Sequence, residues 1–166
     1  GVERLAAEAI SLFPSAKCEI IASDTLNSPS ESEKIFKTIS DGEVDIIIGT
    51  QLIAKGHNFL NLTTVVAIDA DLGLSGGDLR ASERTFQILT QLAGRTGRAD
   101  KKGRAYIQSY DPHHNVMKAI QTGKITRFIK AESEGREYRK LPPYGRLASL
   151  IIQSKNLALL ESFLKT

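Results

Sequence analysis

The feature that most constrains the fold of this chain is an alternation of short apolar runs with longer segments of helical periodicity. The short runs are rich in β-branched residues, whereas apolar residues recur every three or four positions in the segments between them. Strands that alternate with helices favour a parallel, doubly wound α/β sheet, here of about five strands. The functional loops of such a sheet are expected at the carboxyl ends of its strands.

The sequence also predicts where these elements begin and end. Strands are expected at residues 17–23, 44–50, 63–69, 104–110 and 147–153. Helices are expected at 2–13, from the Ser28 cap and Pro29 through Ile39, at 81–93 before Gly94, from the Asp111 and Pro112 cap to Gly123, in the stretch before LPPYG, and at 156–166. One strand and one helix are too little for a domain. Residues 1–141 are therefore expected to form one domain, and residues 142–166 the truncated beginning of a second.

The composition limits the partners and the compartment. The chain has 22 Lys and Arg against 19 Asp and Glu, a net charge of only +3, so any anion site must be local. The single cysteine, Cys18, excludes an internal disulfide framework and a cysteine-rich zinc site, and it favours a reducing, cytoplasmic compartment. No apolar run approaches the roughly 20 residues that a membrane span needs, so no membrane partner is expected.

The chain has no complete phosphate-loop motif of the form GxxxxGK[ST]. Its nearest echo, TGKIT at residues 122–126, lacks both the upstream glycine and a hydroxyl directly after the lysine. We therefore do not expect this chain to cradle a triphosphate by itself. Asp69 and Asp71 follow an apolar strand, and we predict that they are loop carboxylates near a site and not metal ligands. Adjacent His113 and His114 would point about 100° apart on a helix, so no metal site is predicted.

The segment QLAGRTGR, residues 91–98, is the main candidate for an anion site. Arg95 and Arg98 lie among small residues after a helix, and a guanidinium is a planar, permanently charged fork that suits phosphate. The alternative is a basic turn balanced by Asp100 and other nearby acids. A second candidate is GTQLIAKGHNF, residues 49–59, which follows a strand and can offer backbone N–H groups and a hydroxyl to a phosphate.

In order along the chain, these segments resemble the second RecA-like lobe of superfamily 2 helicases, with VDIIIGTQLIAKGHNF in the place of motif V and QLAGRTGR in the place of motif VI. Within that superfamily, ERLAAEAISLFP, SDT, GTQLIAKGHNF, DADLGLSGGDLRASER and LPPYGR are similar to the pattern of the PriA family. The resemblance covers nearly the whole chain. It implies an α/β, RecA-like (P-loop NTPase-type) helicase lobe with a mostly parallel sheet, plus the truncated start of a C-terminal α/β domain.

The resemblance also implies roles for single residues. In such helicases ATP binds between two lobes, and the first lobe, which this chain is expected to lack, supplies the phosphate loop and the acidic Mg²⁺ motif. Arg98 would be the arginine finger on the γ-phosphate, with Arg95 beside it and Gln91 positioning the pair. The remaining candidates are Gly56, Asn58, Gly94 and Gly97 for the nucleotide, and Thr50, Gln51 and His57 for the DNA strand.

The cofactors and partners implied in the same way are ATP and Mg²⁺, single-stranded and forked DNA, primosome proteins and the single-stranded-DNA-binding protein. Zinc is expected in the full-length protein but not in this fragment, and the location is expected to be the bacterial cytoplasm, in association with the nucleoid. The fragment is expected to be inactive alone, as part of an ATP-dependent 3′ to 5′ DNA helicase of replication restart. The alternatives are the second lobe of another superfamily 2 translocase, RecG-like, UvrB-like or an RNA helicase, and a non-catalytic nucleic-acid-binding or protein-binding α/β module.

Overall fold

The structure is a computed structural model that describes residues 1–22, 29–50, 59, 61–75, 77–96, 103–149 and 151–164. The chain divides into two compact units, residues 1–123 and residues 124–166. All strands in the described ranges belong to the first unit, and the regular structure described in the second unit is helical.

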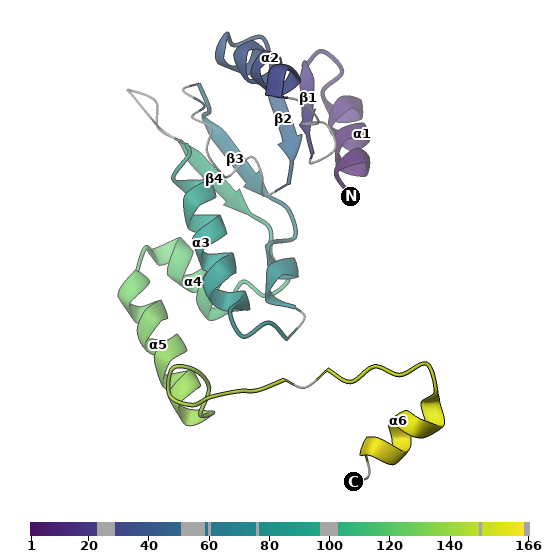
Figure 1. Ribbon diagram of the computed structural model, residues 1–166. Coiled ribbons are helices and arrows are strands. Elements are labelled where there is room, and N and C mark those ends of the chain that lie inside the picture. The colour runs from purple at the N-terminus through teal and green to yellow at the C-terminus, as the bar shows by residue number, and fades with distance from the viewer. Residues whose placement is uncertain are drawn as a thin grey trace. The chain divides into compact units, whose positions relative to one another are not determined.

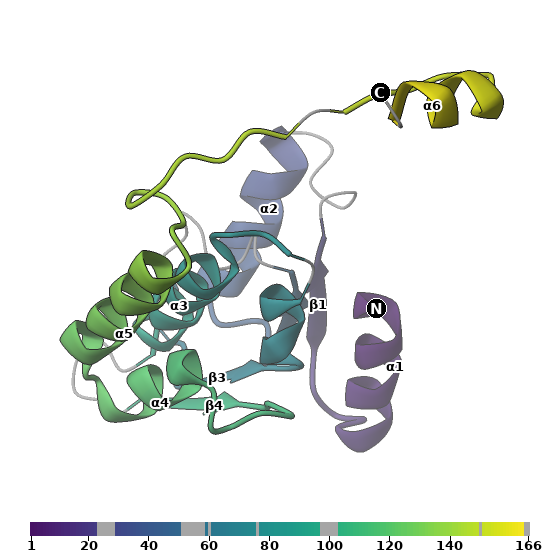
Figure 2. The ribbon, with the colours of Figure 1, turned by 90° about the horizontal axis from the view of Figure 1, so that it is seen from below.

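One part of the first unit is a parallel pair of strands between two helices (Figures 1 and 2). Strand β1 (Cys18–Ile21) pairs with β2 (Ile46–Gly49), so that Ile20 lies opposite Ile48. Helix α1 (Val2–Leu12) packs against both strands, and α2 (Pro29–Ser40) lies on their other side. Neighbouring residues of a strand point to opposite faces, so a β-branched run such as this one can contact a helix on each side of the pair.

The side chains between α2 and the strands form a buried cluster. Ile21, Ile39 and Phe59 are its most buried members, and the ring centroids of Phe36 and Phe59 lie 6.3 Å apart. The residues packed around them are Ile35, Phe36, Val44, Ile47 and Leu62. The apolar face predicted for the second helix is therefore confirmed, because its isoleucines and phenylalanine are the residues that contact the strands.

The other part of the first unit is a β–α–β crossover. Strand β3 (Thr64–Ala67) pairs in parallel with β4 (Arg104–Ile107), and helix α3 (Ala81–Ala93) connects them and packs against both. The short 3-10 helix η2 (Ala70–Leu74) and helix α4 (Asn115–Thr122) also pack against α3. The buried residues of α3 are Ala81, Thr85 and Leu89, which recur every four positions and so form one face.

The strands differ from the prediction in length and number. Each described strand has four residues, and the strands form two separate parallel pairs, β1–β2 and β3–β4. The β3 ladder ends early because Asp69 takes a left-handed backbone conformation, with φ of 51°. The strand predicted at 147–153 is wrong, since residues 147–149 and 151–153 make no strand pairing. A strand needs a neighbour to pair with, and the described part of the second unit offers no other strand.

Helix α4 begins three residues later than the sequence predicted. Its N-cap is His114, whose Nδ1 accepts a hydrogen bond of 3.2 Å from the backbone N–H of Val116. Asp111 and Pro112 instead form the preceding turn, in which the Asp111 carboxylate accepts from the N–H of His113 at 3.1 Å. The predicted Asp-Pro cap is therefore wrong, because an aspartate can close a turn two residues on as readily as it caps a helix.

The second unit contains α5 (Ile125–Tyr138) and α6 (Leu157–Leu164). Helix α5 ends just before LPPYG, and α6 begins after Asn156, whose Oδ1 accepts from the N–H of Ala158 at 3.0 Å. Both helices lie where the sequence predicted them. Among the residues with described structure, no helix is long and apolar enough to cross a membrane.

Candidate functional site

The candidate phosphate-binding segment leaves the carboxyl end of α3 as a regular turn. The N–H of Gly94 donates to the carbonyl of Thr90 at 3.0 Å, and the N–H of Arg95 donates to that of Leu92 at 3.1 Å. Gly94 has φ of −70°, so it continues the right-handed geometry of the helix. These bonds satisfy carbonyls that a helix end otherwise leaves unpaired. The segment is therefore an extension of α3 up to Thr96, the last residue described there.

Gln91 and Arg95 are four residues apart and therefore lie on the same side of this helix end. Gln91 is exposed, and Arg95 is half-buried. An amide and a guanidinium on one side form a donor set that fits a phosphate. The predicted site residues Gly97 and Arg98 lie outside the described residues.

The segment lies at the opposite edge of the β3–β4 pair from the one where functional loops are generally expected. Because α3 connects two parallel strands, it runs back along them, and its carboxyl end lies at their amino edge. Its 13 residues span about 20 Å, so its two ends serve opposite edges of the β3–β4 pair. Gln91 and Arg95 therefore do not lie at the carboxyl ends of these strands, where the functional loops of such a sheet are expected.

The other predicted segment, GTQLIAKGHNF, is described only in part. Thr50 is exposed and follows directly after β2, at the carboxyl end of that strand, as predicted. The candidates Gln51, Gly56, His57 and Asn58 lie outside the described residues. Thr50 is thus the one predicted DNA-contacting residue whose surroundings are known.

Gln108 joins the carboxyl ends of β3 and β4. Its N–H donates to the carbonyl of Ala67 at 2.9 Å, and its own carbonyl accepts from the N–H of Ala70 at 3.0 Å. Its side-chain Oε1 accepts from the N–H of Asp69 at 3.2 Å. A positive φ is uncommon for a residue other than glycine, and Asp69 has one. The hydrogen bonds of Gln108 hold the backbone of residues 67–70 around it.

Asp71 fastens the segment after β4 to the loop after β3. One carboxylate oxygen accepts from the hydroxyl of Ser109 at 2.8 Å, and the other accepts from the N–H of Tyr110 at 2.6 Å. Partial desolvation raises the pKa of Asp71, but these bonds and others from the backbone outweigh it and hold the pKa below its ordinary value. The group of Asp71, Ser109 and Tyr110, called the Asp71 clasp below, gives this carboxylate a structural role.

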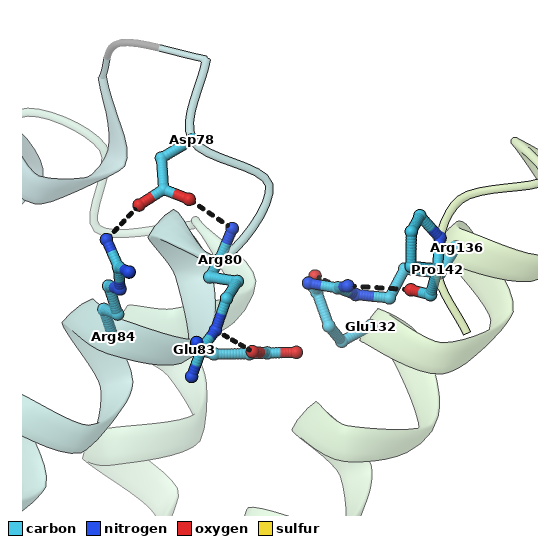
Figure 3. Close-up of polar contacts among 7 residues, drawn as sticks. All are labelled: Asp78, Arg80, Glu83, Arg84, Glu132, Arg136 and Pro142. Atoms are coloured by element: carbon cyan, nitrogen blue, oxygen red, sulfur yellow. Dashed lines mark hydrogen bonds and ion pairs between the residues drawn. The ribbon is translucent and has the colours of Figure 1, made fainter. Parts of the chain in front are cut away.

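Ionic contacts close the amino end of α3 (Figure 3). Asp78 accepts from the N–H of Arg80 at 2.9 Å with one oxygen and from the guanidinium of Arg84 with the other. The Arg80 Nε lies 3.7 Å from a carboxylate oxygen of Glu83. These charges are largely exposed, so each ion pair contributes only about 0–1 kcal/mol.

A close approach of η2 to α3 adds to this end of the helix. A Cβ atom on Gly73 would lie 2.6 Å from the hydroxyl oxygen of Thr85, closer than any real contact of this kind. Thr85 is only 5% exposed and is the one buried polar residue among those described. Position 73 therefore requires glycine because of space, and this contact fixes η2 on α3.

The sequence did not identify Gln108, Ser109 and Tyr110 as partners of the acidic loop. The contacts join residues that are 38 or 39 positions apart, and no local pattern encodes such a pairing. The pairing of the two predicted strands could have indicated these contacts, because residues that follow neighbouring parallel strands meet at one edge of the sheet. In the described part of the chain, no group of three or more His, Cys, Asp or Glu side chains could hold a metal ion.

Residues 2–100 match the model of the helicase conserved C-terminal domain family. The matched span contains β1 to β3, α1 to α3 and the whole of QLAGRTGR. The chain therefore belongs to the helicase conserved C-terminal domain family. The predicted class, an α/β RecA-like helicase lobe with parallel strands, is confirmed by this match and by the two parallel strand pairs.

Within that class, the chain is similar to proteins named replication restart protein PriA. It is 45% identical to that of Rickettsia prowazekii over 152 residues, which cover 92% of this chain and 24% of the relative. It is 36% identical to that of Bacillus subtilis, covering 95% and 20%, and 34% identical to that of Haemophilus influenzae, covering 99% and 22%. The chain thus spans about a quarter or less of the length of these relatives. The predicted resemblance to the PriA family is confirmed.

Proposed function

We propose that this chain is the second motor lobe of an ATP-dependent DNA helicase that moves 3′ to 5′ in replication restart. Its family membership and its similarity to PriA over at least 92% of its length support a motor lobe of this kind. The observation that carries the proposal is the QLAGRTGR segment, which begins on α3 with Gln91 and Arg95 on one side of the helix end.

ATP is the cofactor that this donor set fits, because planar guanidinium groups suit phosphate oxygens. When bound, ATP would supply the phosphoanhydride bond whose hydrolysis drives movement along DNA. Arg98 would act as the arginine finger, with Arg95 beside it and Gln91 orienting the pair. Gly94 and Gly97 would keep this side of the site free of bulky side chains, and the nucleotide's ribose would meet the backbone at Gly56 and the amide of Asn58.

The other half of the ATP site would belong to another lobe. The sequence has no complete phosphate-loop motif, so the triphosphate and Mg²⁺ would be held chiefly outside this chain. The chain alone is therefore proposed to be inactive. Zinc is likewise proposed for another part of the full-length protein.

Single-stranded and forked DNA are the proposed substrates, and primosome proteins and the single-stranded-DNA-binding protein are the proposed partners. Thr50 would contact a backbone phosphate of the DNA strand, for which its exposed position after β2 is suitable. Gln51 and His57 would complete this contact. Because GTQLIAKGHNF would touch both DNA and nucleotide, closure of the lobes on ATP would become a step along the strand.

The first test is Arg98→Ala in the full-length protein. ATP hydrolysis in the presence of single-stranded DNA is expected to fall by about 10³- to 10⁵-fold, as for other arginine fingers. The affinity for single-stranded DNA is expected to stay nearly unchanged, and the control Arg84→Ala, at the other end of α3, should alter neither property. A loss of DNA binding with Arg98→Ala would mean that this arginine contacts DNA and not ATP.

A second test uses the chain alone. Its expected ATP turnover with single-stranded DNA is not measurable, since it would hold half of a site. Turnover at ordinary helicase rates, lost again on Arg98→Ala, would contradict the half-site proposal. A phosphate-loop motif elsewhere in the full-length protein would support a motor, whereas its absence there would favour a non-catalytic nucleic-acid-binding module.

A further inference from the structure

Helix α5 ends in a Schellman motif with a lysine where glycine is usual. The N–H of Leu141 donates to the carbonyl of Arg136 at 2.8 Å, and the N–H of Lys140 donates to that of Glu137 at 3.0 Å. Lys140 has φ of 53°, in the left-handed region that glycine occupies without strain. A side chain in this conformation costs about 1 kcal/mol relative to glycine.

The same molecule uses glycine at the equivalent place on another helix. Helix α4 ends at Gly123, with φ of 66°. Stability alone therefore favours glycine at position 140 as well. A residue that holds an unfavourable backbone conformation is a reason to look for a function of its side chain.

The backbone that follows Lys140 is held firmly. The side chain of Arg136, which is only 12% exposed, donates to Glu132 at 3.1 Å and to the carbonyl of Pro142 at 2.9 Å (Figure 3). The N–H of Tyr144 donates to the carbonyl of Leu141 at 2.9 Å. These bonds fix a sharp turn at the end of the helix, called the α5 corner below and defined as residues 137–146.

A close approach locks the same turn. A Cβ atom on Gly145 would lie 2.0 Å from the carbonyl oxygen of Lys140. The hydroxyl of Tyr144 also forms a hydrogen bond with the hydroxyl of Ser133, which belongs to α5. The α5 corner is thus a rigid support for the side chains that it exposes.

The α5 corner concentrates positive charge. Its ionisable side chains other than the tyrosines are Glu137, Arg139, Lys140 and Arg146, a net charge of +2 in ten residues when the whole chain carries +3. The three basic side chains are exposed and form no ion pair with any described residue, whereas Lys130 on the same helix lies 3.8 Å from a Glu134 oxygen. The helix dipole favours cations at this end, but it does not account for Arg146, which lies beyond the turn.

Tyrosines accompany these cations. Tyr138, in the last turn of α5, is 90% exposed, and Tyr144 is 47% exposed. Basic groups with exposed aromatic rings among them are the combination by which proteins hold single-stranded nucleic acids, since the cations meet phosphates and the rings stack on bases. Tyr138 is too exposed to contribute to a core, and Tyr144 keeps about half of its surface exposed beside its hydrogen bond to Ser133.

We propose that the α5 corner binds single-stranded nucleic acid, with Arg139, Lys140 and Arg146 on the phosphates and Tyr138 stacked on a base. This surface goes beyond the proposed motor site, because the helicase match ends at residue 100 and the candidate motor residues lie in the first unit. It adds a contact that does not depend on ATP. The basic side chains recognise the phosphates of the nucleic acid by their charge. Tyr138 recognises that the nucleic acid is single-stranded, because only an unpaired base leaves its face open for stacking.

The test measures how salt weakens binding of the full-length protein to oligo(dT) and, in a second arm, oligo(U). The variant Arg139→Gln/Lys140→Gly/Arg146→Gln is expected to reduce the slope of log affinity against log salt by about 2, since each phosphate contact on a single strand contributes about 0.7. Lys130→Gln is the matched control and should leave the slope unchanged. An unchanged slope in the triple variant would overturn the proposal.

Two further measurements separate binding from folding and from the motor. Lys140→Gly alone should raise the unfolding temperature, because it relieves the left-handed lysine, and yet weaken oligo(dT) binding. Tyr138→Leu should weaken oligo(dT) about 5- to 150-fold and leave duplex binding unchanged, and equal effects on both would overturn the stacking role. Arg98→Ala should not change the salt slope, so failure of the motor proposal and failure of this one give different results.

Discussion

The two ends of α3 differ in what their side chains bind. At the amino end, Asp78 accepts from the backbone of Arg80 and the side chain of Arg84, and Gly73 is pressed against Thr85. At the carboxyl end, the N–H groups of Gly94 and Arg95 donate to carbonyls of the helix itself, and Gln91 is exposed. The amino end thus holds the fold together, whereas the carboxyl end is the part of α3 that we propose contacts ATP. Changes at the first end should lower stability, and changes at the second should lower the rate of ATP hydrolysis.

Gly73→Ala should have the largest effect on stability. The added methyl group collides with the buried hydroxyl of Thr85, so the free energy of unfolding is expected to fall by about 1–3 kcal/mol, measured by urea denaturation. Thr85→Ala in the same chain removes the colliding oxygen and should recover part of the loss. The control is Gly135→Ala in α5, where nothing lies within 4 Å and alanine should add about 1 kcal/mol. An unchanged midpoint for Gly73→Ala would show that η2 does not press on α3.

Gln91→Ala should affect the rate and not the stability. Under the proposed function, the variant loses one hydrogen bond to the nucleotide or to the arginines, worth about 1.4 kcal/mol, and ATP turnover of the full-length protein is expected to fall by about tenfold. The unfolding midpoint should not move, because the side chain is exposed. A shifted midpoint with normal turnover would reverse the roles assigned to the two helix ends.

Asp71→Asn should reduce stability in a pH-dependent way and by less than Gly73→Ala. The folded-state pKa of Asp71 is lowered, so its contribution is present above about pH 4, the ordinary pKa of an aspartate, and is lost as pH falls through the folded-state pKa. The difference in unfolding free energy between wild type and variant should therefore be largest near neutral pH and shrink on acidification. A difference that stays constant with pH would mean that the charge of Asp71 does not hold Ser109 and Tyr110.

Arg84→Ala should have the smallest effect. Its partner Asp78 and its own side chain are about half exposed, so the ion pair is expected to contribute at most about 1 kcal/mol, less at high salt. ATP turnover should stay at the wild-type level. A tenfold loss of turnover would place a catalytic function at the amino end of α3 and remove the contrast between the two ends.

The sequence predicted helix α3 at about its observed bounds, because its apolar period and Gly94 mark the same end. It placed the four described strands correctly but not their lengths, since a ladder stops where the partner or the backbone turns away, as at Asp69. The strand expected at 147–153 failed for a related reason. An apolar run has strand character, but pairing requires a neighbour that composition does not reveal.

For the candidate site, the sequence supplied the residues of QLAGRTGR but not the edge of the sheet at which they lie. That edge follows from the parallel pairing of β3 with β4, which is a property of the fold and not of the segment. The Asp71 clasp was missed because it depends on where a distant strand ends. The His114 cap was missed because it depends on the turn that precedes the helix. The left-handed Lys140 was missed because local rules place glycine there.

The close approach of Gly145 to the carbonyl of Lys140 has a consequence for mutational tolerance. The contact is with backbone, which cannot move aside as a flexible side chain can, so every other amino acid at position 145 meets the same obstacle. A saturation library of residues 137–146 should therefore show one invariant position next to residues that accept many replacements. Selection for folding alone would preserve Gly145, and only selection for nucleic-acid binding would also preserve the lysine five positions before it.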